Sequence, residues 1–166
     1  MSITSFLRFN VISQPDPANP SKLIQSAQLG PHALFSGGVA MDLLVGVDAI
    51  TAQTLQGAGS LPSPIRVKAL LDTGCTITSI DNALVAALNL KVRGYNPIHT
   101  ANGTITASQH QVSLAFPGTA LTGRSTHTVQ AANLTGQAFQ VLIGRDLMAT
   151  WTITYNGPAG FVSIAD

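Results

Sequence analysis

From residue 37 onward, the apolar residues of this chain occur in short runs separated by turn-forming residues. Residues 65–71 show the pattern most clearly, because apolar residues occupy the odd-numbered positions while Arg66 and Lys68 lie between them. Side chains two positions apart share one face of a strand, so this segment predicts a half-buried strand. Residues 39–48 form an apolar run long enough for a buried strand. Together these runs predict an all-β domain.

Further segments continue this pattern to the end of the chain. Strands are predicted at residues 112–116, 126–131 and 139–143, and a hairpin at residues 151–164 that turns at residues 156–160. Asn102-Gly103 predicts another hairpin, because a type I′ turn needs positive φ at both central positions. Two short helices are expected, at residues 81–90 with Ser79 or Asp81 as the cap and at residues 145–149. Residues 56–64 are expected to form a loop.

Composition narrows the classes of partner. Only 9% of the residues are charged, 45% are hydrophobic, and the net charge is +1. Because no run of lysine or arginine exists, we expect no nucleic-acid partner and no membrane partner. A chain with so little charge must conceal apolar area, and pairing of subunits is one way to do so.

The remaining composition signals concern compartment and metals. Cys75 is the only cysteine, which excludes an intramolecular disulfide framework and fits a reducing compartment. The first residues lack the basic start and long apolar run of a signal peptide, and no apolar stretch is long enough to span a bilayer, so we expect a cytoplasmic protein. Four histidines lack metal-ligand spacing, so neither a metal nor another cofactor is expected: His32, His99, His110 and His127.

The segment that carries chemistry is Asp72-Thr73-Gly74, directly after the strand predicted at residues 65–71. The strand would bring the Asp72 carboxylate to a fixed point, and Thr73 can form hydrogen bonds without adding charge. Gly74 has no Cβ and permits a close approach of backbone. The plain alternative is a turn-forming aspartate, since average residue usage produces Asp-Thr/Ser-Gly by chance in roughly one chain of this length in ten.

A second motif about seventy residues later favours a catalytic aspartate over a turn-forming one. Residues 142–147 read Leu-Ile-Gly-Arg-Asp-Leu, so that an apolar strand leads into a glycine and then a helix start. With both motifs in order, residues 37–166 resemble the retropepsin family of aspartic peptidases, including its bacterial members. The resemblance implies an all-β, retropepsin-like acid-protease barrel with one or two short helices that is active as a two-fold dimer.

The resemblance also assigns roles to residues. In that family two carboxylates share one proton around a water molecule, because two such groups about 3 Å apart cannot both ionise. This chain has one Asp-Thr-Gly, so a homodimer is implied in which each copy supplies Asp72 as the catalytic residue. Thr73 would hydrogen-bond across the interface, and Thr73 and Gly74 would support the active site.

Other positions either match the family or depart from it. Ala101, Asn102 and Gly103 lie where a flap tip would close over substrate, although an ordinary hairpin turn is the alternative. Cys75 stands where retropepsins usually have alanine. Ile77 stands where viral members often carry a carboxylate that binds the substrate backbone, which leaves substrate preference open. We expect Arg145 and Asp146 to cap the helix or to pair with neighbours.

We therefore expect an aspartic endopeptidase that hydrolyses peptide bonds in peptide or protein substrates, through a water activated by the Asp72 dyad at a homodimer interface. The alternative is a catalytically idle dimer of the same fold that binds a peptide or partner protein. Residues 1–36 contain four prolines and are expected to be an irregular N-terminal extension with one short helix at residues 21–29. This extension would be either a pro-segment removed by self-cleavage or an arm that pairs subunits, and residues 37–166 would be the peptidase domain.

Overall fold

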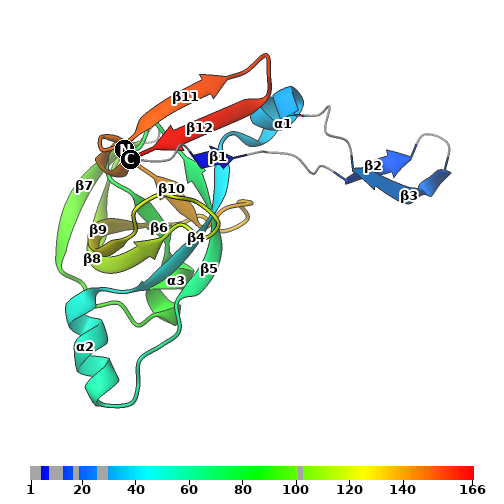
Figure 1. Ribbon diagram of the computed structural model, residues 1–166. Helices are drawn as coiled ribbons and strands as arrows, with labels where there is room; N and C mark the ends of the chain where they lie inside the picture. The colour runs from blue at the N-terminus through cyan, green and yellow to red at the C-terminus, as the bar shows by residue number, and fades with distance from the viewer. Residues whose placement is uncertain (1–4, 8–12, 17–18, 26–29, 101–102) are drawn as a thin grey trace.

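The structure is a computed structural model that describes residues 5–7, 13–16, 19–25, 30–100 and 103–166 (Figure 1). Short strands dominate it. The helices are α1 (Gly30–Gly37), α2 (Ala49–Gly57), α3 (Asn82–Ala87) and α4 (Arg145–Met148). The strands are β1 (Ser5–Leu7), β2 (Ser13–Asp16), β3 (Asn19–Gln25), β4 (Ala40–Val47), β5 (Ile65–Leu71), β6 (Ser79–Asp81), β7 (Gly94–Thr100), β8 (Gly103–Ala115), β9 (Arg124–Ala132), β10 (Val141–Ile143), β11 (Thr152–Asn156) and β12 (Phe161–Ala165).

The main sheet closes on itself. Its strand order is β4-β5-β10-β6-β9-β8-β7, and β4 also pairs with β8. That extra pairing joins six strands into a barrel, which removes the exposed edges that an open sheet would have. Strand β7 is attached only to β8 and extends the sheet beyond the barrel. A second sheet has the order β1-β12-β11, and β2 and β3 form a separate hairpin.

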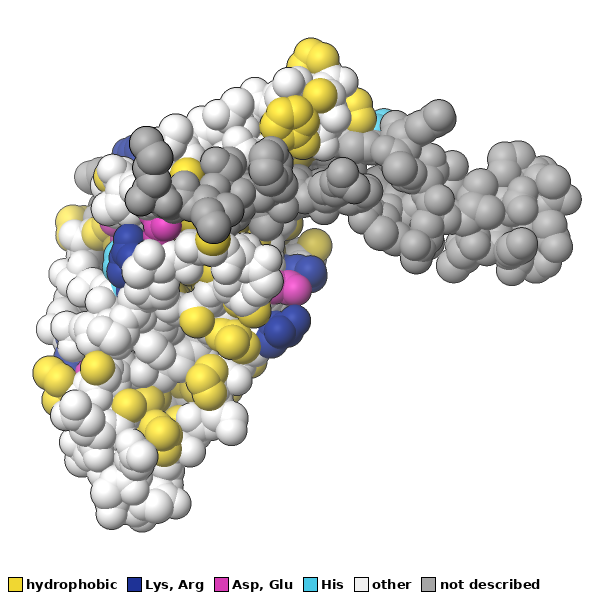
Figure 2. Space-filling model, viewed as in Figure 1, with side chains coloured by type: hydrophobic (Ala, Val, Ile, Leu, Met, Phe, Trp, Pro, Cys, Tyr) yellow, Lys and Arg dark blue, Asp and Glu magenta, His cyan; other side chains and the backbone are white. Residues whose placement is uncertain are grey.

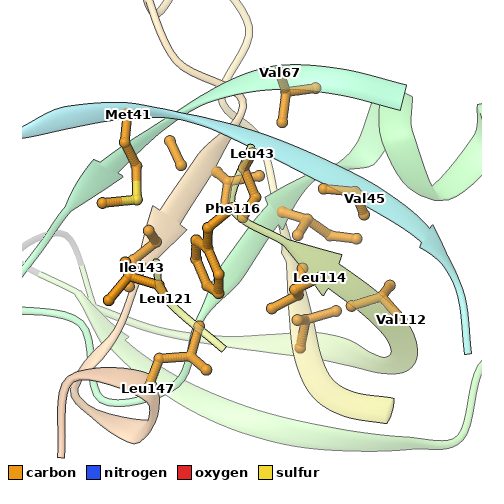
Figure 3. Packing of buried hydrophobic residues seen from close by; sticks show 14 of the residues in the cluster. Met41, Leu43, Val45, Val67, Val112, Leu114, Phe116, Leu121, Ile143 and Leu147 are labelled. Atoms are coloured by element: carbon orange, nitrogen blue, oxygen red, sulfur yellow. The ribbon is translucent and has the colours of Figure 1, made fainter. Parts of the chain in front are cut away.

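Alternation along the strands fills the barrel with apolar side chains. On β5, Val67 and Ala69 are buried, whereas Arg66 and Lys68 face outward and both pair with Asp42 on the neighbouring β4. Figure 3 shows how side chains from several strands meet inside the barrel. The labelled members of this core are Met41, Leu43, Val45, Val67, Val112, Leu114, Phe116, Leu121, Ile143 and Leu147.

The outer surface is poor in charge, as the composition requires. In Figure 2 the blue and magenta side chains are few and scattered among white and yellow ones. None of the helices in the described part of the chain has the length and apolar character that a membrane span requires.

Most elements expected from the sequence are confirmed, including the strands after residue 37, the terminal hairpin and the helices α3 and α4. Asp81 rather than Ser79 caps α3, since its carboxylate accepts a hydrogen bond from the amide of Ala83. Helices α1 and α2 were not expected. Asp48 caps α2 by accepting hydrogen bonds from the amides of Ile50 and Thr51.

The helix expected at residues 21–29 is wrong for residues 21–25, and residues 26–29 lie outside the described residues. Residues 19–25 form β3, which pairs with β2 in antiparallel register. An isolated helix of nine residues is marginal in water, whereas pairing with β2 satisfies backbone groups directly. Within the predicted extension, β1 also pairs with β12, and Leu34 of α1 is buried in the core. The role of residues 1–36 stays a prediction.

Candidate active site

Strand β5 places Asp72. It runs parallel to β10 in a register that pairs Leu71 with Ile143, and the amide of Asp72 donates to the carbonyl of Ile143 at 3.0 Å. Because parallel strands end at the same edge of a sheet, the two sequence motifs meet there although about seventy residues separate them. The fold therefore brings the two sequence motifs to one edge of the sheet.

The loop after β5 folds back on the Asp72 side chain. The amide of Gly74 donates to Asp72 Oδ1 at 2.8 Å, and the amide of Cys75 donates to the carbonyl of Asp72 at 3.0 Å. A Cβ at Gly74 would lie 3.1 Å from Asp72 Oδ1, so glycine permits this close approach. Asp72 is half-buried, and Thr73 and Gly74 are exposed.

Arg145 holds the same loop from the other motif. Its amide donates to the carbonyl of Cys75 at 2.9 Å. Its guanidinium donates to the carbonyl of Thr73 at 2.5 Å and to Thr76 Oγ1 at 2.8 Å. The planar fork of an arginine can make both bonds at once, which a lysine cannot do. The sequence suggested only a cap or a neighbouring pair for Arg145, so this bridge to the Asp72 loop is a role that sequence reasoning missed.

Asp146 anchors the base of the loop. It accepts from the amide and the hydroxyl of Thr78, at 3.0 and 2.8 Å, from the amide of Leu147 at 2.9 Å and from His127 Nε2 at 3.0 Å. Burial acts to raise the pKa of Asp146, but the hydrogen bonds from His127 and Thr78 outweigh it and hold that pKa below its ordinary value. The carboxylate therefore stays ionised in weak acid.

Gly144 allows the second motif to pack against the segment that follows Asp72-Thr73-Gly74. A Cβ at this position would lie 2.7 Å from backbone atoms of Ile77 and Thr78. The amide of Gly144 also donates to Thr78 Oγ1 at 3.1 Å, a bond that is buried. The glycine of the second motif is thus required by packing against the segment that follows Asp-Thr-Gly.

Strands β7 and β8 form the hairpin expected to carry the flap. The register pairs Thr100 with Gly103, so Gly103 is the first residue of β8 rather than part of a two-residue turn at 102–103. Its φ of 118° is in the region that favours glycine. Ala101 and Asn102 lie outside the described residues, so their placement in the flap stays a prediction.

The sequence and the structure both resemble known proteins. A family model described as aspartyl protease matches residues 54–147, which is more than half of the chain. The chain belongs to the aspartyl protease family. Its structure is also similar to the crystal structure of a retropepsin-like aspartic protease from Rickettsia conorii, with a TM-score of 0.49 and 8% identity over 99% of this chain and 93% of that chain. Comparison with curated proteins gives no match.

In this member of the aspartyl protease family, Cys75 lies in the same loop as Asp72 but does not have the character of a nucleophile. Its Sγ lies 2.8 Å from the carbonyl of Ile77 and 3.4 Å from Ser79 Oγ. Burial, together with the negative charges of Asp72 and Asp146, raises the pKa of the Cys75 thiol. The uncharged thiol packs as a small side chain in the loop.

The aspartyl protease motif supplies one candidate catalytic carboxylate in each chain. Within residues 30–100 and 103–166 the other acidic side chains already have partners: Asp42 with Arg66 and Lys68, Asp48 and Asp81 as helix caps, Asp146 with Thr78 and His127, and Asp166 with the amide of Thr122. The chain contains no glutamate. Among the described residues, no group of three His, Cys, Asp or Glu side chains could hold a metal ion.

Proposed function

We propose that this chain is an aspartic endopeptidase whose active centre forms when two copies pair and each contributes Asp72. The observation that carries the proposal is the fixed placement of one half-buried carboxylate at the common end of β5 and β10, next to an exposed Thr73-Gly74 surface. A homodimer supplies the missing second carboxylate, and its two-fold axis would run beside Asp72.

The chemistry needs two carboxylates in different protonation states. Two such groups about 3 Å apart share one proton, since both cannot ionise together. The ionised Asp72 takes a proton from the bound water as its oxygen attacks the peptide carbonyl. The protonated Asp72 of the other copy donates a hydrogen bond to the developing oxyanion.

The hydrogen bonds of one chain support this arrangement. Gly74 binds Asp72 Oδ1 and leaves Oδ2 without a partner among the described residues, so one carboxylate oxygen is oriented and the other is available to water. Arg145 holds the loop through the carbonyl of Thr73, and the exposed Thr73 would lie at the proposed interface. A catalytic group held this way loses little entropy when the reaction begins.

Strand β7 pairs with β8 outside the closed part of the sheet, and the β7–β8 hairpin is the proposed flap; both strands are labelled in Figure 1. Closing it over an extended peptide would exclude water from the dyad. An extended peptide could then bind as an added strand between the flap and the floor of the barrel. The proposed flap tip comprises Ala101, Asn102 and Gly103.

The proposal is tested by cleavage of an unfolded protein substrate between pH 3 and 7, comparing wild type with Asp72→Asn. Asparagine keeps an oxygen for the Gly74 amide, so the fold and the pairing should remain while cleavage falls by about a thousandfold or more. The size of both proteins is measured by sedimentation in the same buffers.

Cleavage that increases toward acid and is absent from a still-dimeric Asp72→Asn protein would support the dyad. Equal cleavage by both proteins would place the activity elsewhere. A wild type that stays monomeric at full activity would refute the shared site. No cleavage by either protein would favour the catalytically idle dimer that binds a peptide or partner protein.

A further inference from the structure

A pocket of about 540 Å³ lies between α2 and the segment that follows α3. Its volume is in the range of small-molecule sites, which is about 300–1,000 Å³. The loop that leads into β5 forms part of its wall, whereas Asp72 follows the other end of β5. At about 3.3 Å per residue, a seven-residue strand puts the pocket about 20 Å from Asp72. Its lining includes Ile50, Leu55, Ala87, Leu88, Lys91 and Arg93, together with two threonines, a serine, a proline and an asparagine.

One wall of the pocket is the face of α2 that carries Ile50, Leu55 and two threonines. Helix α2 has no buried residue, and Ile50 is 68% exposed. Leu55 is half-buried against the core, and the buried Leu88 also lines the pocket. A helix of nine residues depends on a covered apolar face for its stability. The pocket leaves part of this face open, so an apolar occupant would complete its packing.

A second part of the lining, the cationic wall, carries positive charge. Lys91 and Arg93 line the pocket, and no acidic side chain is among the lining residues. Lys91 has no ion pair within the described part of the chain. Arg93 Nη2 lies 3.9 Å from Asp48 Oδ2, which is long for a charge-assisted hydrogen bond. The Asp48 carboxylate is already engaged as the cap of α2, where Thr51 Oγ1 donates to Oδ2 at 2.6 Å.

The cationic wall is held in place by the barrel. His110 is only 1% exposed, and its Nδ1 lies 3.0 Å from the carbonyl of Lys91. The amide of Arg93 donates to the carbonyl of Gln109 at 2.7 Å. Both contacts come from β8, so the backbone that carries the two cations is positioned before any ligand arrives. A preformed site avoids part of the ordering cost of binding.

We propose that this pocket binds an apolar group that carries one carboxylate. The apolar part would lie on Leu55, Ala87 and Leu88, and the carboxylate would face Lys91 and Arg93. A free medium-chain carboxylic acid has this chemistry, and so does a peptide that ends in an apolar residue. The site is separate from the Asp72 loop, and binding there requires no peptide cleavage.

The binding test uses dansyl-labelled undecanoic acid and its methyl ester, followed by dansyl fluorescence with the full-length protein. The acid should bind more tightly than the uncharged ester. Lys91→Gln should weaken binding of the acid by about two- to fivefold, the worth of one exposed charge pair. Ala87→Phe should weaken it by about tenfold or more, because the ring would occupy the pocket. Lys68→Gln removes the same charge on the outer face of β5 and should leave binding unchanged.

Lys91 and Ala87 are exposed, so both variants should keep the wild-type melting temperature. Displacement by octanoate would support a free acid as the ligand, and displacement by a leucine-terminated peptide, but not by its amide, would support a peptide end. Equal binding of acid and ester, or binding that neither Lys91→Gln nor Ala87→Phe weakens, would overturn the proposal. Because no outcome depends on cleavage, the result stands apart from that of Asp72→Asn.

Discussion

Replacing Asp146 by asparagine tests whether its ionised carboxylate stabilises the loop that carries Asp72. Three of its hydrogen bonds end on Oδ1, from the amide and hydroxyl of Thr78 and from the amide of Leu147. Asparagine keeps this oxygen and nearly the same shape. The change therefore removes the charge, and with it the charge assistance, while leaving most of the geometry in place.

The expected loss can be worked out from these contacts. Hydrogen bonds to a charged group exceed neutral ones by about 1 kcal/mol each. The Asp146 side chain is 23% exposed and the Thr78 amide shares its bond between both oxygens, so the sum over four donors is reduced. We expect Asp146→Asn to lower the free energy of unfolding by about 2 kcal/mol. With a urea m-value of about 2 kcal/mol/M, the midpoint should fall by about 1 M.

The pH dependence gives a second and sharper criterion. Because the folded-state pKa of Asp146 lies below the ordinary aspartate value of 3.8, its stabilisation is complete above that value and is lost as pH falls through the folded pKa. The difference between wild type and Asp146→Asn should therefore be smaller at pH 3 than at pH 7. Urea unfolding at a fixed protein concentration measures both differences.

Asp42→Asn is the matched control. Lys68 and Arg66 lower the pKa of Asp42 as well, through a hydrogen bond from Lys68 and the charges of both, but this carboxylate lies at the surface. Solvent screening limits the free energy of unfolding lost in Asp42→Asn to less than about 0.5 kcal/mol. A loss at Asp146 no greater than that at Asp42, or one of equal size at pH 3 and pH 7, would refute the reasoning.

Three further changes test the contacts around the loop. Gly144→Ala would press a methyl group against backbone 2.7 Å away, so the melting temperature should fall by about 5 °C, and an unchanged melting curve would contradict this packing. Arg145→Lys cannot hold both the Thr73 carbonyl and the Thr76 hydroxyl, so kcat/KM should fall by about tenfold with little change in stability; unaltered kinetics would remove Arg145 from the positioning of the loop. Because burial raises the pKa of Cys75, iodoacetamide should modify the native protein more slowly at pH 8 than it modifies a free thiol, and equal rates would count against a buried thiol.

Local patterns predicted the barrel strands well, because alternation on β5 and the apolar run of β4 require a particular burial. Helix α2 was missed because its residues have no apolar periodicity, and only the Asp48 cap indicates it. The Asn102-Gly103 signal predicted the hairpin but not its register, since strand pairing places Gly103 opposite Thr100.

The candidate site was likewise predictable from the sequence only in part. The Asp-Thr-Gly segment could be read directly, because its three residue types have distinct uses at the end of a strand. The contacts of Asp146 could not, because Thr78 and His127 are scattered through the sequence and converge only when the barrel has closed. Arg145 was assigned to its own helix because its guanidinium partners precede it by about seventy residues.

The parallel pairing of β5 with β10 also sets a time order for the molecule's synthesis. Asp72 is held by the carbonyl of Ile143, so the carboxylate has no fixed position until that later residue has left the ribosome. The roughly seventy residues between them take about 4 to 14 s to make at about 5 to 20 residues per second. During that interval the nascent chain carries its Asp-Thr-Gly segment without the strand that orients it. The Asp72 backbone therefore takes up its native pairing only late in synthesis.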